Sequence, residues 1–148
     1  MTTKIALVFI VLLPMVGGAS EDAVKADLKQ LQGTWSTAKL HYNGKDYTEK
    51  YKFRFVIKGE HIAVEGNAAV AKEYGKIAFK LLAGTKPKAI DLVVGEGTQK
   101  DAAIEGIYEL KDDELTLCAK VLGKERPTTF ASPDGGSVVL LVLKREKQ

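Results

Sequence analysis

The sequence predicts an all-β fold of about nine strands with a short helix before them. Apolar and polar residues alternate in short runs along most of the chain, as they do in strands with one buried and one solvated face. Compact turn signals separate these runs at intervals of roughly 8–12 residues, which is typical of a β-sandwich or a β-barrel. The chain has 148 residues, the length of one ordinary domain, and contains no low-complexity linker and no internal repeat.

The first 20 residues have the pattern of a secretory signal peptide. Lys4 precedes an apolar run at 5–16, and small residues follow at 17–20. The apolar run of 12 residues is shorter than the roughly 20 that a membrane-spanning helix needs. We therefore expect a cleaved signal peptide at 1–20 and no membrane span in the mature protein. An uncleaved anchor is the alternative.

Cleavage is expected near Ala19 or Ser20, which leaves 21–148 as a secreted or periplasmic domain. Cys118 is the only cysteine, so an internal disulfide is impossible and the fold depends on its apolar core. We expect Cys118 to be a small, semi-buried side chain in a strand; a reactive thiol or an intermolecular bridge is the alternative. The net charge of +3 is small and evenly spread, and it gives no reason to expect a nucleic-acid partner.

A short amphipathic helix is predicted at 20–31. Val24, Leu28 and Leu31 recur at the i, i+4 and i+7 positions of one helix face. Ser20 is a suitable N-cap residue for this helix. We expect the helix to cover one end of the sheet, and a helix that binds a partner is the alternative.

Strands are predicted where the period of the apolar residues becomes two. Asn43-Gly44 is the strongest turn signal, because both central positions of a type I′ hairpin turn need a positive φ. The last strand is expected from Val138 to Arg145. The other clear runs lie at 51–58, 61–65, 77–82, 90–94 and 115–121.

The two ends of the β region indicate a closed barrel. Gly33-Thr34-Trp35 begins the first strand just after the helix, and Arg145 ends the last strand. In this arrangement the sequence resembles the lipocalins and their calycin relatives, although it lacks the Thr-Asp-Tyr-type motif of lipocalins proper. The resemblance implies a lipocalin-like antiparallel β-barrel of about 8–9 strands, closed by Gly33, Trp35 and Arg145. The first and last strands would pair, with the guanidinium of Arg145 over the indole of Trp35.

Six motifs in order cover nearly all of the mature chain. They lie at 31–35, 87–92, 106–110, 115–118, 126–127 with Phe130, and 143–145. Together they are similar to a family of small secreted domains of unknown function that is abundant in planctomycetes. The resemblance implies a lipocalin-like fold and export, and it offers no activity and no binding residues to carry over.

No catalytic or metal-binding motif stands out in the sequence. His41 and His61 fall on different predicted strands, without the spacing of metal ligands. The acidic cluster at 112–114 lacks the spaced oxygen ligands of a calcium loop and is expected to form a hairpin turn. Asp91 and Arg126 are expected to form a structural ion pair, with a ligand contact as the alternative. We therefore expect no enzyme activity, no cofactor and no metal.

Two functions remain, and they differ in what occupies the barrel. In the first, the domain binds a small apolar molecule in an interior lined by Tyr51, Phe53, Phe55 and Phe79. In the second, the same side chains fill the interior, and the domain is a protein-interaction or structural module of the cell envelope. Analogy of fold favours the first function, whereas the bulk of nearly every inward side chain favours the second.

Overall fold

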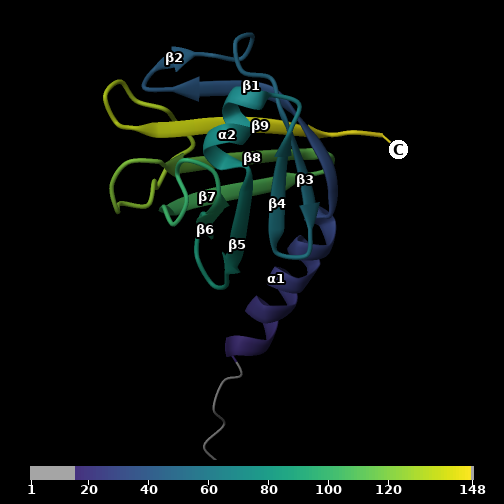
Figure 1. Ribbon diagram of the computed structural model, residues 1–148. Helices are drawn as coiled ribbons and strands as arrows, with labels where there is room; N and C mark the ends of the chain where they lie inside the picture. Colours follow the sequence, from purple (N-terminus) through teal and green to yellow (C-terminus); the bar gives the residue numbers. More distant parts are fainter. Residues whose placement is uncertain (1–15, 148) are drawn as a thin grey trace, which may run out of the picture.

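The computed structural model describes residues 16–147, which form nine strands and two helices (Figure 1). Of the predicted signal peptide, 1–15 lie outside the described residues, and the remainder belongs to α1. The helices are α1 (Val16–Leu31) and α2 (Ala68–Tyr74). The strands are β1 (Gly33–Tyr42), β2 (Lys45–Asp46), β3 (Arg54–Lys58), β4 (His61–Glu65), β5 (Lys76–Leu82), β6 (Lys88–Glu96), β7 (Ala103–Lys111), β8 (Glu114–Lys120) and β9 (Val138–Arg145).

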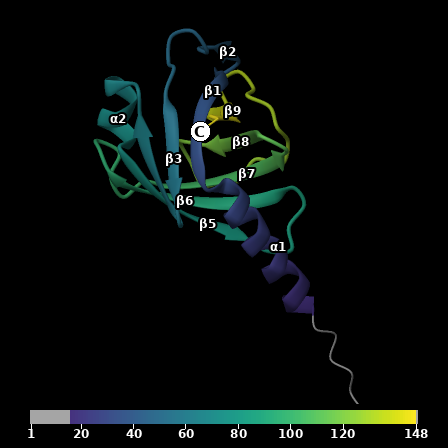
Figure 2. The same cartoon turned by 90° about the vertical axis from the view of Figure 1, so that its right-hand side faces the viewer.

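Eight of the strands, β1 and β3 to β9, form a closed antiparallel barrel. Each strand from β3 to β9 pairs with its neighbours in sequence, and β1 pairs with both β3 and β9, which closes the ring. β2 pairs only with the end of β1. Figure 2 shows the strands curving around a common interior, with α1 at one end of it. The structure thus confirms the predicted all-β barrel with a short helix before it.

The strand predicted at 51–58 is shorter in the structure, because β3 begins at Arg54. Phe53, just before it, is bound to a side chain of β1. The Thr37 hydroxyl donates to the Phe53 carbonyl at 2.8 Å, and the Phe53 amide donates to the same hydroxyl at 3.2 Å. The hydroxyl of Thr37 therefore serves as a hydrogen-bond partner for the backbone of Phe53, just before β3 begins to pair with β1.

The helix α2 was not predicted from the sequence. Its N-cap is Asn67, whose side-chain oxygen accepts from the Val70 amide at 3.1 Å, which is a standard way to begin a helix. The helix has only seven residues and none of them is buried, so it produces little apolar periodicity. Within 16–147, neither helix is long and apolar enough to cross a membrane.

The antiparallel order places the connections alternately at two ends of the barrel. At the helix end, α1 packs and the connections are short, at 59–60, 83–87 and 112–113. The Gln32 side chain, just after α1, binds the backbone of Gly59 in one of these turns, with its amide donating at 3.0 Å and its carbonyl accepting at 2.7 Å. At the opposite loop end the connections are longer, at 47–53, 66–75, 97–102 and 121–137.

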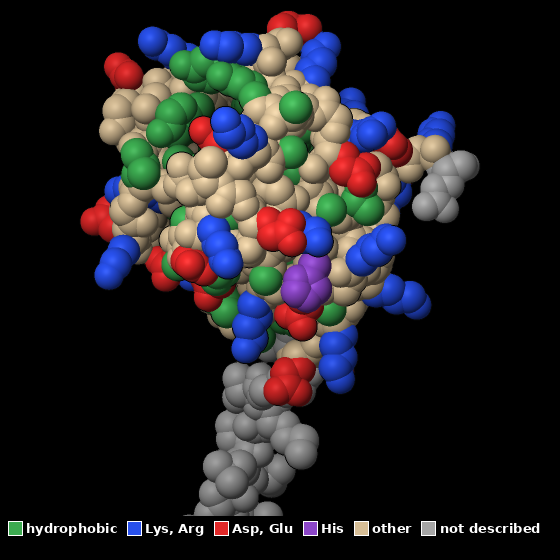
Figure 3. Space-filling view, in the orientation of Figure 1, with side chains coloured by type: hydrophobic (Ala, Val, Ile, Leu, Met, Phe, Trp, Pro, Cys, Tyr) green, Lys and Arg blue, Asp and Glu red, His purple; other side chains and the backbone are tan. Residues whose placement is uncertain are grey.

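The barrel interior is an apolar core that contains side chains from every strand of the ring and from α1. Trp35, Val94 and Leu143 are fully inaccessible to solvent. On the face seen in Figure 3, charged side chains of both signs are interspersed and form no field of one sign. This surface agrees with the small net charge.

A second, smaller apolar cluster lies on the outer face of the barrel, under the connection 121–137. Cys118 belongs to it and is fully buried, with Ile107 and Val138 beside it and Phe130 packed against them. The burial raises the pKa of the Cys118 thiol. Cys118 is therefore a strand residue as predicted, and it is more deeply buried than the sequence indicated.

Candidate functional site

The barrel interior is almost completely filled. Its internal cavity has a volume of about 10 Å³, which is roughly the space that one water molecule needs. Its apolar walls offer a water few partners. The cavity is lined by Leu31, Ile57, Ile62, Phe79, Ile90, Tyr108, Leu115 and Leu117.

The four residues predicted to line a ligand site lie in two different surroundings. Phe53, Phe55 and Phe79 are buried in the interior, and the rings of Phe53 and Phe55 lie 5.4 Å apart. Tyr51 is only half-buried, at the loop end, with its ring 5.9 Å from that of Tyr47. Of the four, only Phe79 borders the small internal cavity. The structure therefore brings three of them together as packing.

A larger cavity lies at the helix end, between α1 and the connection from β5 to β6. Its volume is about 240 Å³ and it is partly open to solvent. Tyr108 separates it from the interior, since its side chain borders both cavities. The remaining walls are formed by Ala23, Val24, Asp27, Leu82, Ala83, Gly84, Thr85 and Lys88.

One polar cluster marks this cavity. Asp27 Oδ2 accepts a hydrogen bond from Lys88 Nζ at 2.8 Å and another from the Tyr108 hydroxyl at 2.7 Å. Asp27 is the one buried charged residue among those described. The Lys88 side chain is half exposed, whereas that of Asp27 is 13% exposed. The cluster therefore presents its ammonium group to solvent more than its carboxylate.

Three elements bring this cluster together. Asp27 lies on the inner face of α1, three residues after Val24. Lys88 and Tyr108 are directly opposite each other in the pairing of β6 with β7, so their side chains leave the same face of the sheet. The sequence analysis missed Asp27. Its signal was an acidic residue within the apolar stripe of a predicted helix, which requires a polar partner when it is buried.

The surroundings of Tyr108 keep its hydroxyl neutral. Burial raises the pKa of Tyr108 well above the ordinary value of 10.0, and the hydrogen bond to Asp27 and the charge of that carboxylate raise it further. Ionisation would place a phenolate beside a carboxylate in a poorly solvated site. Tyr108 therefore acts as a hydrogen-bond donor to Asp27 over the whole physiological pH range.

The closure residues meet at the same end of the barrel. Trp35 pairs directly with Arg145 across β1 and β9, and the guanidinium carbon of Arg145 lies 4.3 Å from the centre of the Trp35 ring. The indole nitrogen of Trp35 donates to the Leu31 carbonyl at 2.8 Å. This is the contact that the resemblance to calycins implied.

Arg145 also binds the carboxyl end of α1. Its guanidinium donates to the carbonyls of Gln30 and Gln32, the latter at 2.7 Å. Helix carbonyls at this end lack intrahelical partners, and a cation there also interacts favourably with the helix dipole. Gly33 leaves room for the arginine, because a Cβ at this position would lie 3.2 Å from Arg145 Nη1, and its φ of +122° disfavours other residues. The three closure residues thus fix α1 to the barrel.

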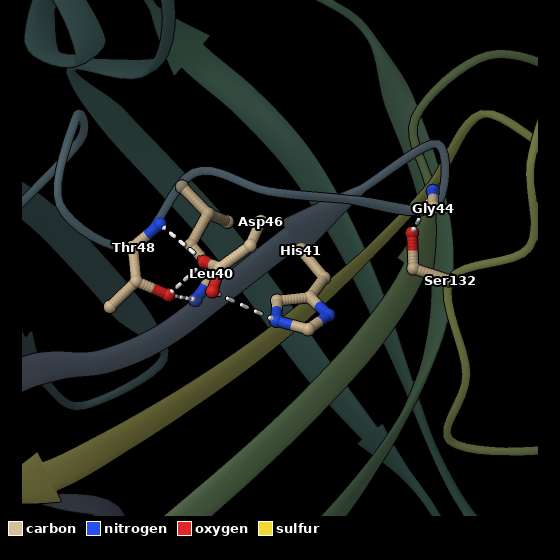
Figure 4. A network of polar contacts seen from close by, with 6 residues as sticks. All are labelled: Leu40, His41, Gly44, Asp46, Thr48 and Ser132. Carbon is tan, nitrogen blue, oxygen red and sulfur yellow. Dashed lines mark hydrogen bonds and ion pairs between the residues drawn. The ribbon is translucent and has the colours of Figure 1, made fainter.

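A separate polar network lies at the loop end, around the β1–β2 hairpin (Figure 4). His41 Nε2 is 3.7 Å from Asp46, and Asp46 accepts from the Thr48 amide at 2.8 Å and from its hydroxyl at 2.6 Å. The bonds from Thr48, and then the nearby His41, lower the pKa of Asp46. Ser132 Oγ accepts from the Gly44 amide and donates to the Val138 carbonyl. These contacts hold the hairpin and the neighbouring connection in place.

The remaining candidates have structural surroundings. Arg126 Nη2 contacts Asp91 at 2.6 Å, as expected, and Nη1 donates to the carbonyls of Ile90 and Gly106. These bonds attach the connection 121–137 to the barrel. His61 is exposed, and Asp112 has the positive φ of a tight turn residue. Within 16–147 there is no group of three or more histidine, cysteine or acidic side chains that could hold a metal ion.

Comparison of the chain with protein-family models, with curated proteins and with solved structures finds no match.

Proposed function

We propose that this protein is an exported binding domain that holds a small, mainly apolar molecule in the cavity at the helix end. The observation that supports it is the contrast between two volumes, about 240 Å³ beside α1 and about 10 Å³ inside the barrel. An engineered apolar cavity of about 150 Å³ admits benzene, and drug-sized ligands occupy roughly 300–1,000 Å³. The expected ligand is therefore smaller than a typical drug.

The chemistry of the walls supports the same proposal. Small and apolar residues form one part of the lining, and the polar groups of Asp27, Lys88, Tyr108 and Thr85 form the other. Binding sites for small molecules commonly combine mostly apolar walls with a few fixed polar groups. The proposed ligand site therefore lies at the helix end of the barrel, whereas the sequence predicted it among the interior residues.

The test is a native mass spectrum of the mature protein, purified gently from the exported fraction of its own cells. We expect a stoichiometric small-molecule adduct that disappears on denaturation. The variant Ala23→Trp fills the cavity and should lose the adduct. Ala26→Trp is the matched control, because Ala26 is exposed on the same helix and does not line the cavity; it should keep the adduct.

The filled interior favours a second candidate, a protein-interaction or structural module of the cell envelope. A bare mass for the wild type would contradict the binding proposal and support this one. The same preparation tests export, since the mature protein should begin near Glu21 after removal of the predicted signal peptide. An intact N-terminus in that fraction would contradict the cleavage prediction.

A further inference from the structure

The charged groups of the helix-end cavity are not equally accessible. Asp27 Oδ2 receives both the Lys88 ammonium and the Tyr108 hydroxyl, so two donors already stabilise the carboxylate. The side chain of Lys88 is 50% exposed, and that of Asp27 only 13%. A ligand that enters from solvent therefore meets the ammonium group first.

Lys88 has hydrogen-bonding capacity beyond its contact with Asp27. An ammonium group carries three donors, and the structure shows one hydrogen bond from Lys88 among the described residues. Because Tyr108 shares Oδ2, the carboxylate does not depend on Lys88 alone. A second acceptor could then bind Lys88 without breaking the existing pair.

The other groups near Lys88 also favour an acceptor. Thr85 lines the same cavity and has a hydroxyl donor. Lys86 is exposed on the same short connection and adds a second positive charge to it. Apart from Asp27 and Tyr108, the rest of the wall is small or apolar, from Val24 on α1 to Leu82 on β5. The cavity thus combines an apolar body with one donor-rich side, on which the Lys88 ammonium is more exposed than its partner, the Asp27 carboxylate.

We infer that the ligand is a small amphipathic anion, of the class of a medium-chain carboxylate, whose head group binds Lys88 and whose apolar part lies against α1 and the β5–β6 connection. This inference rests on the proposed function and specifies its ligand class. Lys88 is the head-group residue, and Asp27 and Tyr108 are positioning residues that hold its ammonium at the cavity wall.

Three probes with the same chain and different head groups test the inference: octanoate, octanol and octylamine, titrated calorimetrically into the mature protein at neutral pH. We expect octanoate to bind about tenfold more tightly than octanol, the factor that one charge-assisted hydrogen bond provides. Octylamine should bind most weakly. The octanoate preference should shrink as salt is added, because the ammonium is partly exposed.

Two matched lysine variants sharpen the test. Lys88→Met should abolish the preference for octanoate over octanol and keep octanol binding, whereas Lys86→Met should keep most of the preference. Lys88→Arg retains a cation and should restore it. A circular dichroism spectrum and an unfolding curve establish that each variant is folded.

Equal binding of octanoate and octanol, or tighter binding of octylamine, would overturn the anion inference and leave the cavity proposal standing. A preference that survives Lys88→Met would overturn the role of Lys88. If none of the probes binds while the native adduct remains sensitive to Ala23→Trp, only the ligand class is refuted. If that adduct is also absent, the proposed function itself fails.

Discussion

The two ends of the barrel are closed by different physical means. At the helix end, α1 is held by directional bonds: Trp35 and Arg145 bind its last carbonyls, and Lys88 and Tyr108 bind Asp27. At the loop end, half-buried side chains pack against the core, and they are supplied largely by long connections. Four of the five tyrosines lie at the loop end, namely Tyr42, Tyr47, Tyr51 and Tyr74.

This difference shows where the fold fixes polar atoms in space. The loop end also contains directional bonds, around the β1–β2 hairpin, but these join exposed or partly buried groups and hold the connections in place. The bonds at the helix end position an ammonium and a hydroxyl, each within 3 Å of the same carboxylate oxygen. A site that recognises a head group needs such fixed donors, so the comparison favours the helix end as the functional one.

The largest expected loss of stability follows from a substitution among the residues that close the helix end. Trp35→Ala removes a fully buried indole and the platform of Arg145, and we expect a loss of about 3–5 kcal/mol in the free energy of unfolding. Tyr51→Ala, at a half-buried loop-end position, should cost clearly less. Urea denaturation measures both. Equal losses would contradict the idea that the two ends are closed differently.

The next largest loss of stability is expected in the polar cluster, where Asp27 and Tyr108 are coupled by a hydrogen bond. Asp27→Ala leaves the buried Tyr108 hydroxyl without its acceptor, and we expect a cost of about 1–3 kcal/mol. Tyr108→Phe removes that hydroxyl, so the double variant should be less destabilised than the sum of the single variants. A double-mutant cycle from unfolding curves gives the coupling. Strict additivity would mean that the two side chains act independently.

The alkaline stability of the protein should report on Tyr108. Because its pKa is raised in the folded state, folding favours the protonated phenol, so the contribution to stability is complete below about pH 10 and is lost as the pH rises further. Tyr108→Phe should reduce this alkaline loss. Tyr74→Phe at the loop end should reduce it less, although burial and the charge of Glu73 also raise the pKa of Tyr74. Thermal melts in strongly alkaline buffers, with tyrosinate absorbance as a second readout, distinguish the three proteins.

The smallest effect is expected from Asp46, at the loop end. Its pKa is lowered in the folded state, so its contribution is present above the ordinary value of 3.8 and is lost as the pH falls below it. Asp46 is exposed, and water screens its contacts. Asp46→Asn should therefore change the acid branch of the stability curve only slightly. A large acid shift in this variant would show that the hairpin network matters more than its exposure indicates.

Much of the barrel could be predicted because its signals are local. The strand β9 has the predicted bounds, Val138 to Arg145, since the turn residues at 133–136 precede an apolar run that ends at two charged residues. Asn43 and Gly44 have the positive φ values that their turn signal required. The short helix α2 was not predicted because it has only seven residues, and its apolar face consists of little more than Val70 and Tyr74.

The candidate site depends on long-range packing, which one sequence does not reveal. Asp27 is 61 residues from Lys88 and 81 from Tyr108, and only the curvature of the sheet and the angle of α1 bring them together. The aromatic side chains of the interior were recognisable from the pattern. Whether they enclose a cavity or fill it depends on their rotamers and on the register of the strands, so the volume had to come from the structure.

The pairing of β1 with β9 has a consequence for how the chain reaches its native state. Trp35 and Arg145 are partners in the ladder, although nearly the whole length of the domain separates them. A ribosome delivers β1 first and β9 last, so the ring cannot close until the final strand emerges. Contacts of such high sequence separation slow folding and leave strand edges exposed in the meantime. We propose that the chain is exported in an unfolded state. Late closure is then an advantage, because the barrel cannot complete its fold, and so block translocation, before its last residues have been made.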